Sequence, residues 1–278
     1  MTDQPNYDKL LLPIADVTAS VETLLDGAFG NLMGDQRESL KRVYAAAWGL
    51  HTLLLDIVTN IGIENIAKRS YLPQKFDEYL NPFVTDSMNL IQGLDGPLNE
   101  EQHVSVEFIH ATGGLLRHYV DNLWLYSQLN NDLYRLDKQF TKMETIVNPM
   151  QWSVTTNPVE LELLIPEALP PVQVDATLMQ AVIAQVVENA INNTHEGIIR
   201  VSVSLEDRMM LITVHDTGGG IPEMYLQDIF IPYFQVNPDQ LGLGLGLSIA
   251  QKGLLLHQGV LTVEANKQET TVKMRFPI

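Results

Sequence analysis

The stretch from Gln180 to Ala250 contains four motifs that together constrain the fold more than any other part of the chain. The first, QAVIAQVVENAINNT, has apolar residues at helical spacing and predicts a helix with one buried face. The second, HDTGGGIP, predicts a strand that ends in a glycine turn, and the third, IFIPYF, holds paired aromatic residues. The fourth, GLGLGLSIA, predicts a glycine loop that opens a helix. Because backbone N–H groups at such a helix N-terminus attract anions, the fourth motif favours a phosphate-binding site.

In this order the four motifs resemble the ATP-binding domain of sensor histidine kinases. That domain belongs to an ATPase superfamily shared with gyrase, heat-shock chaperone and mismatch-repair ATPases, and the resemblance covers Pro158 to Ile278. It implies ATP and Mg²⁺ as ligands, with Asn189 as the Mg²⁺ ligand and Asp216 as the residue that reads adenine. A turn Asp that caps the glycine run is the alternative reading of Asp216. The nucleotide-binding residues that the resemblance implies are Asn189, Asp216, Gly218, Gly220, Ile221, Phe230, Gly242, Gly244, Leu245 and Gly246.

The sequence departs from this family where the phosphates would lie. The family usually has a basic residue three positions after the metal-binding Asn, and here that residue is Asn192. The family's first Asn in the same helix is Gln185, a position at which gyrase-like members place a Glu that activates water. The segment QVNPDQL, between Phe234 and Gly242, contains neither Lys nor Arg. Since phosphoryl transfer relies on positioned cations, only Mg²⁺ is clearly provided. Glu188 is the remaining candidate for a general base, and an ordinary helix-surface Glu is the alternative.

The pattern around these motifs predicts an α/β sandwich for residues 151–278, in which a mixed sheet has helices on one face. The predicted strands are Val159–Ile165, Arg200–Leu205, Met209–His215, Val260–Ala265 and Thr271–Pro277, with a hairpin turn at 206–208. Upstream, we expect a long helix to become polar from Leu129 to Lys142 and to stop before Pro149. The domain boundary is therefore expected near residue 150, followed by a connector from Met150 to Asn157.

The N-terminal half contains an internal repeat. DKLLLPIADVTASVETLLDG begins at Asp8, and DEYLNPFVTDSMNLIQGLDG begins at Asp77 with the same Pro and the same closing LDG. After a turn that differs in length by three residues, the match continues from Gly30 and Gly96. Chance similarity of two amphipathic helices is the alternative to duplication. Each copy predicts a helical hairpin, one in residues 1–70 and one in 71–150, and two hairpins can close an antiparallel four-helix bundle. The expected fold class is thus α+β.

Each hairpin resembles the dimerisation and phosphotransfer hairpin of histidine kinases, whose first helix carries the motif H-E-L-R-T-P-L. In both copies an Asp, Asp8 or Asp77, stands where the family has its phosphoacceptor His. A carboxylate is a far weaker nucleophile than an imidazole unless a metal or nearby cations activate it. We therefore expect no autophosphorylation at the usual position, and we expect a monomer whose two hairpins form a pseudo-dimeric bundle within one chain. We assign no catalytic role to the seven His residues, which are His51, His103, His110, His118, His195, His215 and His257.

Composition narrows the partners and the compartment. The net charge of −17 argues against nucleic acid and anionic membrane as partners, because both require basic patches. The sequence has no apolar run of about 18 residues and no N-terminal signal, so no membrane insertion and a cytoplasmic location are expected. The absence of Cys excludes disulfides and thiolate metal sites.

Three functions remain open from the sequence. The first is an ATP- and Mg²⁺-binding protein of two-component signalling that no longer phosphorylates itself on the usual His, with a response regulator or another histidine kinase as its partner. The second is an active kinase or phosphotransferase that uses a non-standard acceptor in cis or in a partner. The third is an interaction module whose nucleotide site is vestigial. Whether the protein is an enzyme is therefore left open by the sequence.

Overall fold

The computed structural model describes residues 7–147, 159–238, 240 and 242–278. The chain divides into a helical unit that ends at Asn131 and a sheet unit that begins at Asp132, rather than near residue 150. The boundary falls earlier because β1 (Gln139–Thr141) pairs antiparallel with β3 (Val172–Val174), and α5 (Met143–Val147) packs against α6 (Ala176–Asn193). The expected connector, 150–157, lies outside the described residues.

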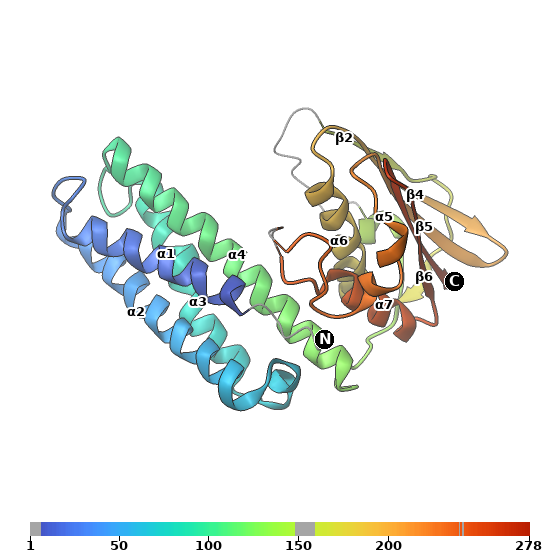
Figure 1. Cartoon of the computed structure of the whole chain (residues 1–278), viewed down its shortest axis with the longest axis horizontal. Helices are drawn as coiled ribbons and strands as arrows, with labels where there is room; N and C mark the ends of the chain where they lie inside the picture. Colours follow the sequence, from blue (N-terminus) through green and yellow to red (C-terminus); the bar gives the residue numbers. More distant parts are fainter. Residues whose placement is uncertain (1–6, 148–158, 239, 241) are drawn as a thin grey trace. The chain divides into compact units, whose positions relative to one another are not determined.

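The helical unit is built from α1 (Asp8–Leu25), α2 (Gly34–Asp56), α3 (Leu72–Ile91) and α4 (Glu100–Asn130) (Figure 1). α1 and α3 each pack against both α2 and α4, so the four helices enclose one core. A π-helical turn, η1 (Ile57–Ile61), and a 3₁₀ turn, η2 (Ile63–Lys68), join α2 to α3. None of the described helices is both long and apolar enough to cross a membrane.

Helix α4 ends at Asn130, so the expected helix through Lys142 is wrong. The side-chain amide of Asn131 donates hydrogen bonds to the carbonyl oxygens of Ser127 (2.8 Å) and Glu64 (2.5 Å). Asp132 follows with φ of 56°, a conformation that a helix cannot continue. Capping of the last turn by Asn131 therefore ends the helix well before the proline.

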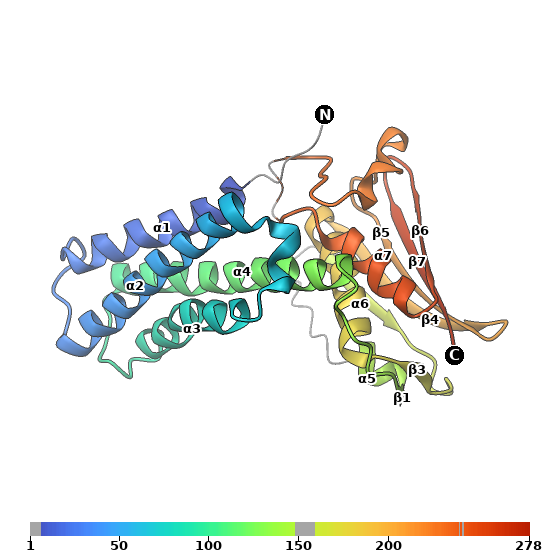
Figure 2. The same ribbon diagram turned by 90° about the horizontal axis from the view of Figure 1, so that it is seen from below.

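The buried positions of the two hairpins, which lie side by side in Figure 2, repeat with a constant offset of 66 residues. In α1 and α3 the buried pairs are Leu10 and Phe76, Ile14 and Leu80, Val17 and Phe83, Val21 and Ser87, and Leu24 and Leu90. In α2 and α4 the pairs include Leu40 and Val106, Val43 and Ile109, Ala47 and Gly113, and Leu50 and Leu116. The sequence alignment paired the first helices of the two hairpins at an offset of 69 residues, and the structure shows that this offset is wrong. Asp8 and Asp77 are consequently not equivalent positions.

The turns between the paired helices fix this register. Gly27 and Gly93 both have positive φ, at 77° and 72°, and Gly30 and Gly96 follow with 97° and 102°. In both turns the second glycine N–H donates to the carbonyl oxygen of the first, at 3.0 and 3.1 Å. Only glycine adopts such φ values readily, so the paired glycines, and not the LDG tripeptide, mark the equivalent positions.

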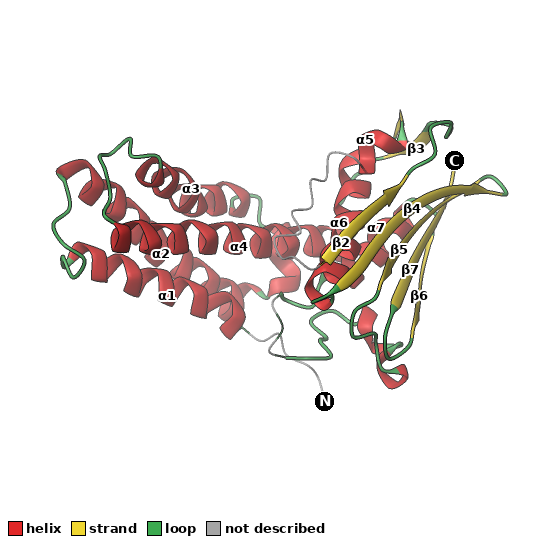
Figure 3. Cartoon of the chain, turned by 90° about the horizontal axis from the view of Figure 1, so that it is seen from above, coloured by secondary structure: helices red, strands yellow, loops and turns green. Residues whose placement is uncertain are grey.

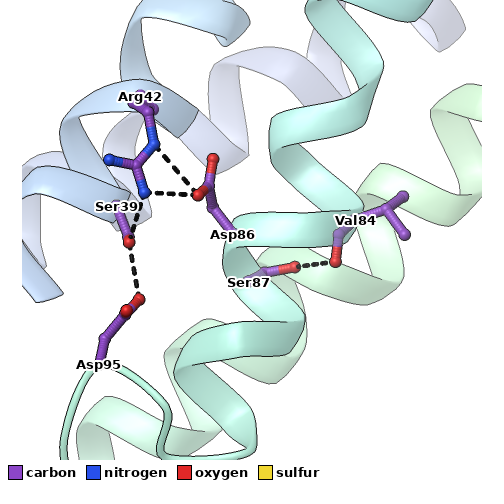
Figure 4. A network of polar contacts seen from close by, with 6 residues as sticks. All are labelled: Ser39, Arg42, Val84, Asp86, Ser87 and Asp95. Atoms are coloured by element: carbon purple, nitrogen blue, oxygen red, sulfur yellow. Dashed lines mark hydrogen bonds and ion pairs between the residues drawn. The ribbon is translucent and has the colours of Figure 1, made fainter.

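The α2–α3 contact carries a polar network (Figure 4) whose two charged residues are not repeated at the equivalent positions of α4 and α1. Arg42 donates to Oδ1 of Asp86 through Nε (3.1 Å) and Nη2 (2.6 Å), and Nη2 also donates to Ser39 Oγ (2.8 Å). Ser39 in turn donates to Asp95 at 2.7 Å. The Asp86 side chain is only 12% exposed, so the arginine offsets the cost of burying its charge. At the positions 66 residues away from Arg42 and Asp86 the chain has Phe108 and Ser20.

The sheet unit contains a five-stranded mixed sheet in the order β2-β4-β5-β7-β6. Its strands are β2 (Val159–Leu164), β4 (Gly197–Glu206), β5 (Met209–Asp216), β6 (Val260–Ala265) and β7 (Thr270–Pro277). Only β2 and β4 are parallel. Helices α6 and α7 (Gly246–Leu256) cover one face (Figure 3), which confirms the predicted sandwich. Met210, Ile212 and Val214 alternate along β5 and are buried, as expected for a strand with one covered face.

Candidate nucleotide site

Helix α6 carries the first predicted site residues. It begins where the Asp175 carboxylate accepts a hydrogen bond from the Leu178 N–H at 3.0 Å, which satisfies a free donor of the first turn. Glu188 and Asn189 lie half-buried in its last turns. The amide of Asn193 donates to the Asn189 backbone oxygen at 2.7 Å. The end of α6 is thus held by side-chain amides close to the predicted metal ligand.

Asp216 is the last residue of β5, and only 5% of it is exposed. Its Oδ1 accepts a hydrogen bond from the Gly218 N–H at 3.1 Å. Burial raises the pKa of the Asp216 carboxyl, and the Gly218 N–H and the nearby His215 partly offset this rise. A buried carboxylate with one oxygen fixed by the backbone presents its other oxygen as an acceptor, which is what recognition of an exocyclic amino group requires.

The first glycine box is packed too tightly for larger residues. A Cβ on Gly218 would overlap with the Asn193 carbonyl oxygen, and the Gly219 N–H donates to that same oxygen at 3.4 Å. Gly220 has φ of 64°, and a Cβ there would overlap with the Asn266 carbonyl oxygen in the β6–β7 turn. The box therefore joins the end of α6 to the edge of the sheet beside Asp216.

The second glycine box leads into α7. Gly244 has φ of 69°, and its carbonyl oxygen accepts from the Tyr233 N–H at 2.8 Å. Gly246 is the first residue of α7, and a Cβ there would lie 2.9 Å from Gln185 Oε1 of α6. Leu245 is buried at the N-cap position, and its carbonyl oxygen accepts from Ser248 Oγ and the Ile249 N–H. This close packing brings the start of α7, with its backbone donors, alongside α6.

The remaining predicted residues lie in the loop between the two boxes or at its end. Ile221 follows the first box directly, and Phe230 ends the short 3₁₀ helix η4 (Asp228–Phe230); both are half-buried. Gly242 has φ of 106°, and nothing lies within 4 Å of the place its Cβ would occupy. Farther along the loop, Tyr225 and Phe234 pack with ring centroids 5.7 Å apart. Asn189 lies on α6, and Gly218 and Gly246 both pack closely against that helix, with Asp216 hydrogen-bonded to Gly218. The other predicted residues lie on the loop between the two boxes or at its end: Ile221, Phe230 and Gly242.

Sequence reasoning missed three polar residues of this region. Asn193 bridges α6 and the first glycine box; its position four residues after Asn189, on the same helical face, was the available signal. Gln240 donates to Asn193 Oδ1 at 3.0 Å. Thr270 is buried and pairs directly with Asp216 across β5 and β7. The sequence pattern did not indicate that Asp216 and Thr270 lie opposite each other on neighbouring strands.

His257 and Asp175 form a polar joint where α7 ends and α6 begins. The Asp175 N–H donates to His257 Nε2 at 3.0 Å, and His257 Nδ1 donates to the Gly253 carbonyl oxygen at 2.9 Å. Burial lowers the pKa of His257, which keeps the ring neutral and leaves Nε2 able to accept. The second carboxylate oxygen of Asp175 accepts from the Asp137 N–H at 3.0 Å. His257 therefore has a structural role, in keeping with the expectation that it is not catalytic.

The donor set suits a nucleotide-bound magnesium ion better than a metal held by protein alone. Within the described part of the chain, no three His, Asp or Glu side chains are grouped as metal ligands. Asn189 offers a neutral amide oxygen, a hard donor of the kind Mg²⁺ accepts. Mg²⁺ bound with nucleotides commonly takes one or two protein ligands and completes its shell with phosphate oxygens and water. Asn189 fits that role.

Comparisons with known proteins agree with this geometry. Residues 174–278 match the family described as histidine kinase-, DNA gyrase B-, and HSP90-like ATPase. The chain is 24% identical over 258 residues to sensor protein EvgS of Escherichia coli K12, which covers 85% of this chain and 22% of EvgS. It is 37% identical over 111 residues to the adaptive-response sensory kinase SasA of Gloeothece citriformis, covering 38% of this chain and 28% of SasA. The chain thus spans about a quarter of the length of these relatives.

Two solved structures share the fold. Acinetobacter baumannii AdeS gives a TM-score of 0.53 at 18% identity, covering 74% of this chain and 97% of that chain. Full-length ShkA in complex with AMPPNP gives a TM-score of 0.61 at 20% identity, covering 74% of this chain and 45% of that chain. At these identities the likeness concerns the fold alone.

Proposed function

Residues 174–278 form a histidine kinase-, DNA gyrase B- and HSP90-like ATPase domain, and from this premise we propose that the protein binds ATP with Mg²⁺ in two-component signalling. The observation that carries the proposal is the buried carboxylate of Asp216, which is fixed by the Gly218 N–H and followed by Gly218 and Gly220, two positions that admit no side chain. Asp216 binds the adenine amino group. The Mg²⁺ ion, where it is bound, screens the phosphate charge and is held on the protein side by Asn189.

The backbone donors at the start of α7 and in the second glycine box bind the phosphates. Ile221, Phe230 and Leu245 supply apolar surface for the base and sugar. Glu188 is placed on the same helix as Asn189, which suits a general base, and a helix-surface role is the alternative. The ShkA structure was solved with AMPPNP, a nucleotide analogue, which supports the same ligand class here.

We further propose that the protein does not phosphorylate itself at the position usual for the family. The sequence motif aligns Asp8 and Asp77 with that position; the corrected register shows that the two are not equivalent to each other, and neither carries an imidazole. Arg117 donates to Asp77 Oδ1 at 2.5 Å, a cation that the sequence alone did not bring near it. Because a nearby cation is one of the things that can activate a carboxylate, Asp77 is the acceptor to test for the alternative function; the proposal itself rests on the absence of an imidazole at this position. The protein then acts through a partner, a response regulator or another histidine kinase.

Binding is tested by thermal shift of the full chain with Mg-ATP. A ligand that binds only the folded state raises the melting temperature by mass action. Asp216→Asn removes the carboxylate and abolishes the shift. Asp207→Asn makes the same change in the β4–β5 turn, where φ of 47° suits Asn as well as Asp, and leaves the shift intact. If both variants lose the thermal shift equally, or if the parent chain shows no shift with Mg-ATP, the proposed site is contradicted. An interaction module with a vestigial nucleotide site is then favoured.

Phosphorylation is tested with γ-labelled ATP. No stable label on the chain is expected. Acid-labile label marks a phosphohistidine and contradicts the proposal. Base-labile label that Asp77→Asn abolishes marks an acyl phosphate and supports the alternative, a phosphotransferase with a non-standard acceptor.

A further inference from the structure

The loop before α7 is tied to α6 by neutral amide side chains. Gln240 Nε2 donates to Asn193 Oδ1 at 3.0 Å, and Asn193 Nδ2 donates to the Asn189 carbonyl oxygen at 2.7 Å. Gln235 Nε2 donates to the carbonyl oxygens of Gln240 (3.4 Å) and Gly242 (3.3 Å). We call Asn189, Asn193, Gln235 and Gln240 the amide cluster. Asn189 in this cluster is the predicted metal ligand, and Gln235 and Gln240 belong to the loop that leads to the second glycine box, so the phosphates of a bound nucleotide would lie beside the cluster.

The same segments contain no positive side chain. Between Ala176 and Ile199, and between Met209 and Gln251, the sequence has neither Lys nor Arg. It has six carboxylates in these stretches: Glu188, Glu196, Asp216, Glu223, Asp228 and Asp239. Two basic residues of the sheet are paired elsewhere, Arg200 with Glu162 and Lys273 with Glu264, each at 2.6 Å. The segments that build the pocket are therefore acidic overall.

Amides and backbone N–H groups bind phosphate oxygens but add no net charge, whereas Lys and Arg offset the charge of each phosphate. A γ-phosphate adds about one negative charge to a nucleotide. In a site whose α6 and loop segments carry carboxylates and neither Lys nor Arg, that added charge is repelled, and the repulsion is stronger at low ionic strength. An ordinary ATP site, lined by cations, has the opposite preference.

We propose that the amide cluster makes this pocket selective for a nucleoside diphosphate over a triphosphate, an inference that rests on the proposed nucleotide function. The Asn193–Gln240 pair holds the loop against α6 without the cation that would recognise a γ-phosphate. Mg²⁺ reduces the discrimination because it offsets charge on either nucleotide.

The test is calorimetric titration of the full chain with ADP and with ATP, in EDTA and in excess Mg²⁺. In EDTA and low salt we expect ADP to bind about five- to tenfold more tightly than ATP, which corresponds to about one unit of charge repelled at a screened distance. Added NaCl and added Mg²⁺ should each reduce the difference between the affinities for ADP and for ATP. If ATP binds in EDTA as tightly as ADP, or more tightly, the inference is wrong.

Asn192→Lys supplies the missing charge. Asn192 is exposed on α6 one turn beyond Asn189, so a long basic side chain there reaches the phosphate end without disturbing the core. We expect this variant to raise the affinity for ATP more than that for ADP and to reverse the preference. Asn192→Gln is the matched control, longer than Asn but uncharged, and it keeps the parent preference. Equal effects of Lys and Gln contradict a charge mechanism.

Different results contradict the proposed nucleotide function and the proposed selectivity for a diphosphate. If neither ADP nor ATP binds under any of these conditions, the proposed function fails and the selectivity fails with it. If both bind and ATP is preferred in EDTA, the nucleotide function stands and only the charge inference is lost.

Discussion

Two neighbouring glycines in α4 provide a sharp test of how closely α3 and α4 pack within the second hairpin. Gly113 is buried, and a Cβ there would lie 2.5 Å from Cβ of Phe83 on α3 and 3.3 Å from its backbone carbon. Gly114 is exposed, and nothing lies within 4 Å of the place its Cβ would occupy. Both residues are inside the same helix. Substitution by Ala therefore adds the same methyl group to two environments that differ only in packing.

The expected effects have opposite signs. Ala is favoured over Gly inside a helix by about 1 kcal/mol, so Gly114→Ala stabilises the helical unit by about that amount. Gly113→Ala gains the same propensity but must push α3 away. The atoms it meets are the backbone and Cβ of Phe83, which cannot rotate aside, and overpacking of this kind costs about 1–3 kcal/mol. The propensity gain is common to both variants, so they should differ in the free energy of unfolding by the overpacking cost alone, about 1–3 kcal/mol.

The assay is urea and thermal unfolding of both variants, followed by far-UV circular dichroism at the transition of the helical unit. For a unit of this size 1 kcal/mol corresponds to a shift in Tm of roughly 4 °C, so the two variants should melt roughly 4–12 °C apart. Equal stability of Gly113→Ala and Gly114→Ala would refute the close approach of α3 to α4.

Two further outcomes are expected. Burial lowers the pKa of His257 from 6.5, so the folded state binds fewer protons than the unfolded state, and the stability that this residue contributes is lost as the pH falls below about 6.5 toward the lowered pKa. His257→Gln should flatten this part of the pH–Tm curve, because Gln has no proton to gain; an unchanged slope would assign the pH dependence to other groups. The hairpins should pair within one chain, so light scattering should give a mass near 31.2 kDa, and a mass of about twice that value would contradict the monomer.

The sheet unit was predicted from local signals that leave few alternatives. Alternation along Met209–His215 and the turn at 206–208 set one strand pair, and Asp207 and Arg208 do adopt the positive φ values of a tight hairpin, 47° and 64°. The second glycine motif predicted a loop followed by a helix, and α7 begins at Gly246. What the sequence could not give was β1 and β3, because three-residue strands carry too little pattern and exist here through their pairing with each other.

The helical unit was predicted less completely for a physical reason. Shifting one amphipathic helix by three residues keeps most apolar positions on the same face, so an offset of 69 fits the pattern of α1 and α3 almost as well as 66. The shared Pro13 and Pro82 favoured the wrong offset. The turn decides the question, since only one offset aligns the glycines that need positive φ.

The corrected register explains why unlike hairpins should pair. In this chain Arg42 of the first hairpin meets Asp86 of the second. If two copies of the first hairpin paired instead, as in a symmetric dimer, Arg42 would face Ser20, the equivalent of Asp86, and would lose its carboxylate. If two copies of the second hairpin paired, Asp86 would be placed near Phe108, the equivalent of Arg42, and its mostly buried charge would be left without a cation. An unpaired buried carboxylate costs several kcal/mol, so the divergence of the two copies favours the pairing that one chain provides for itself.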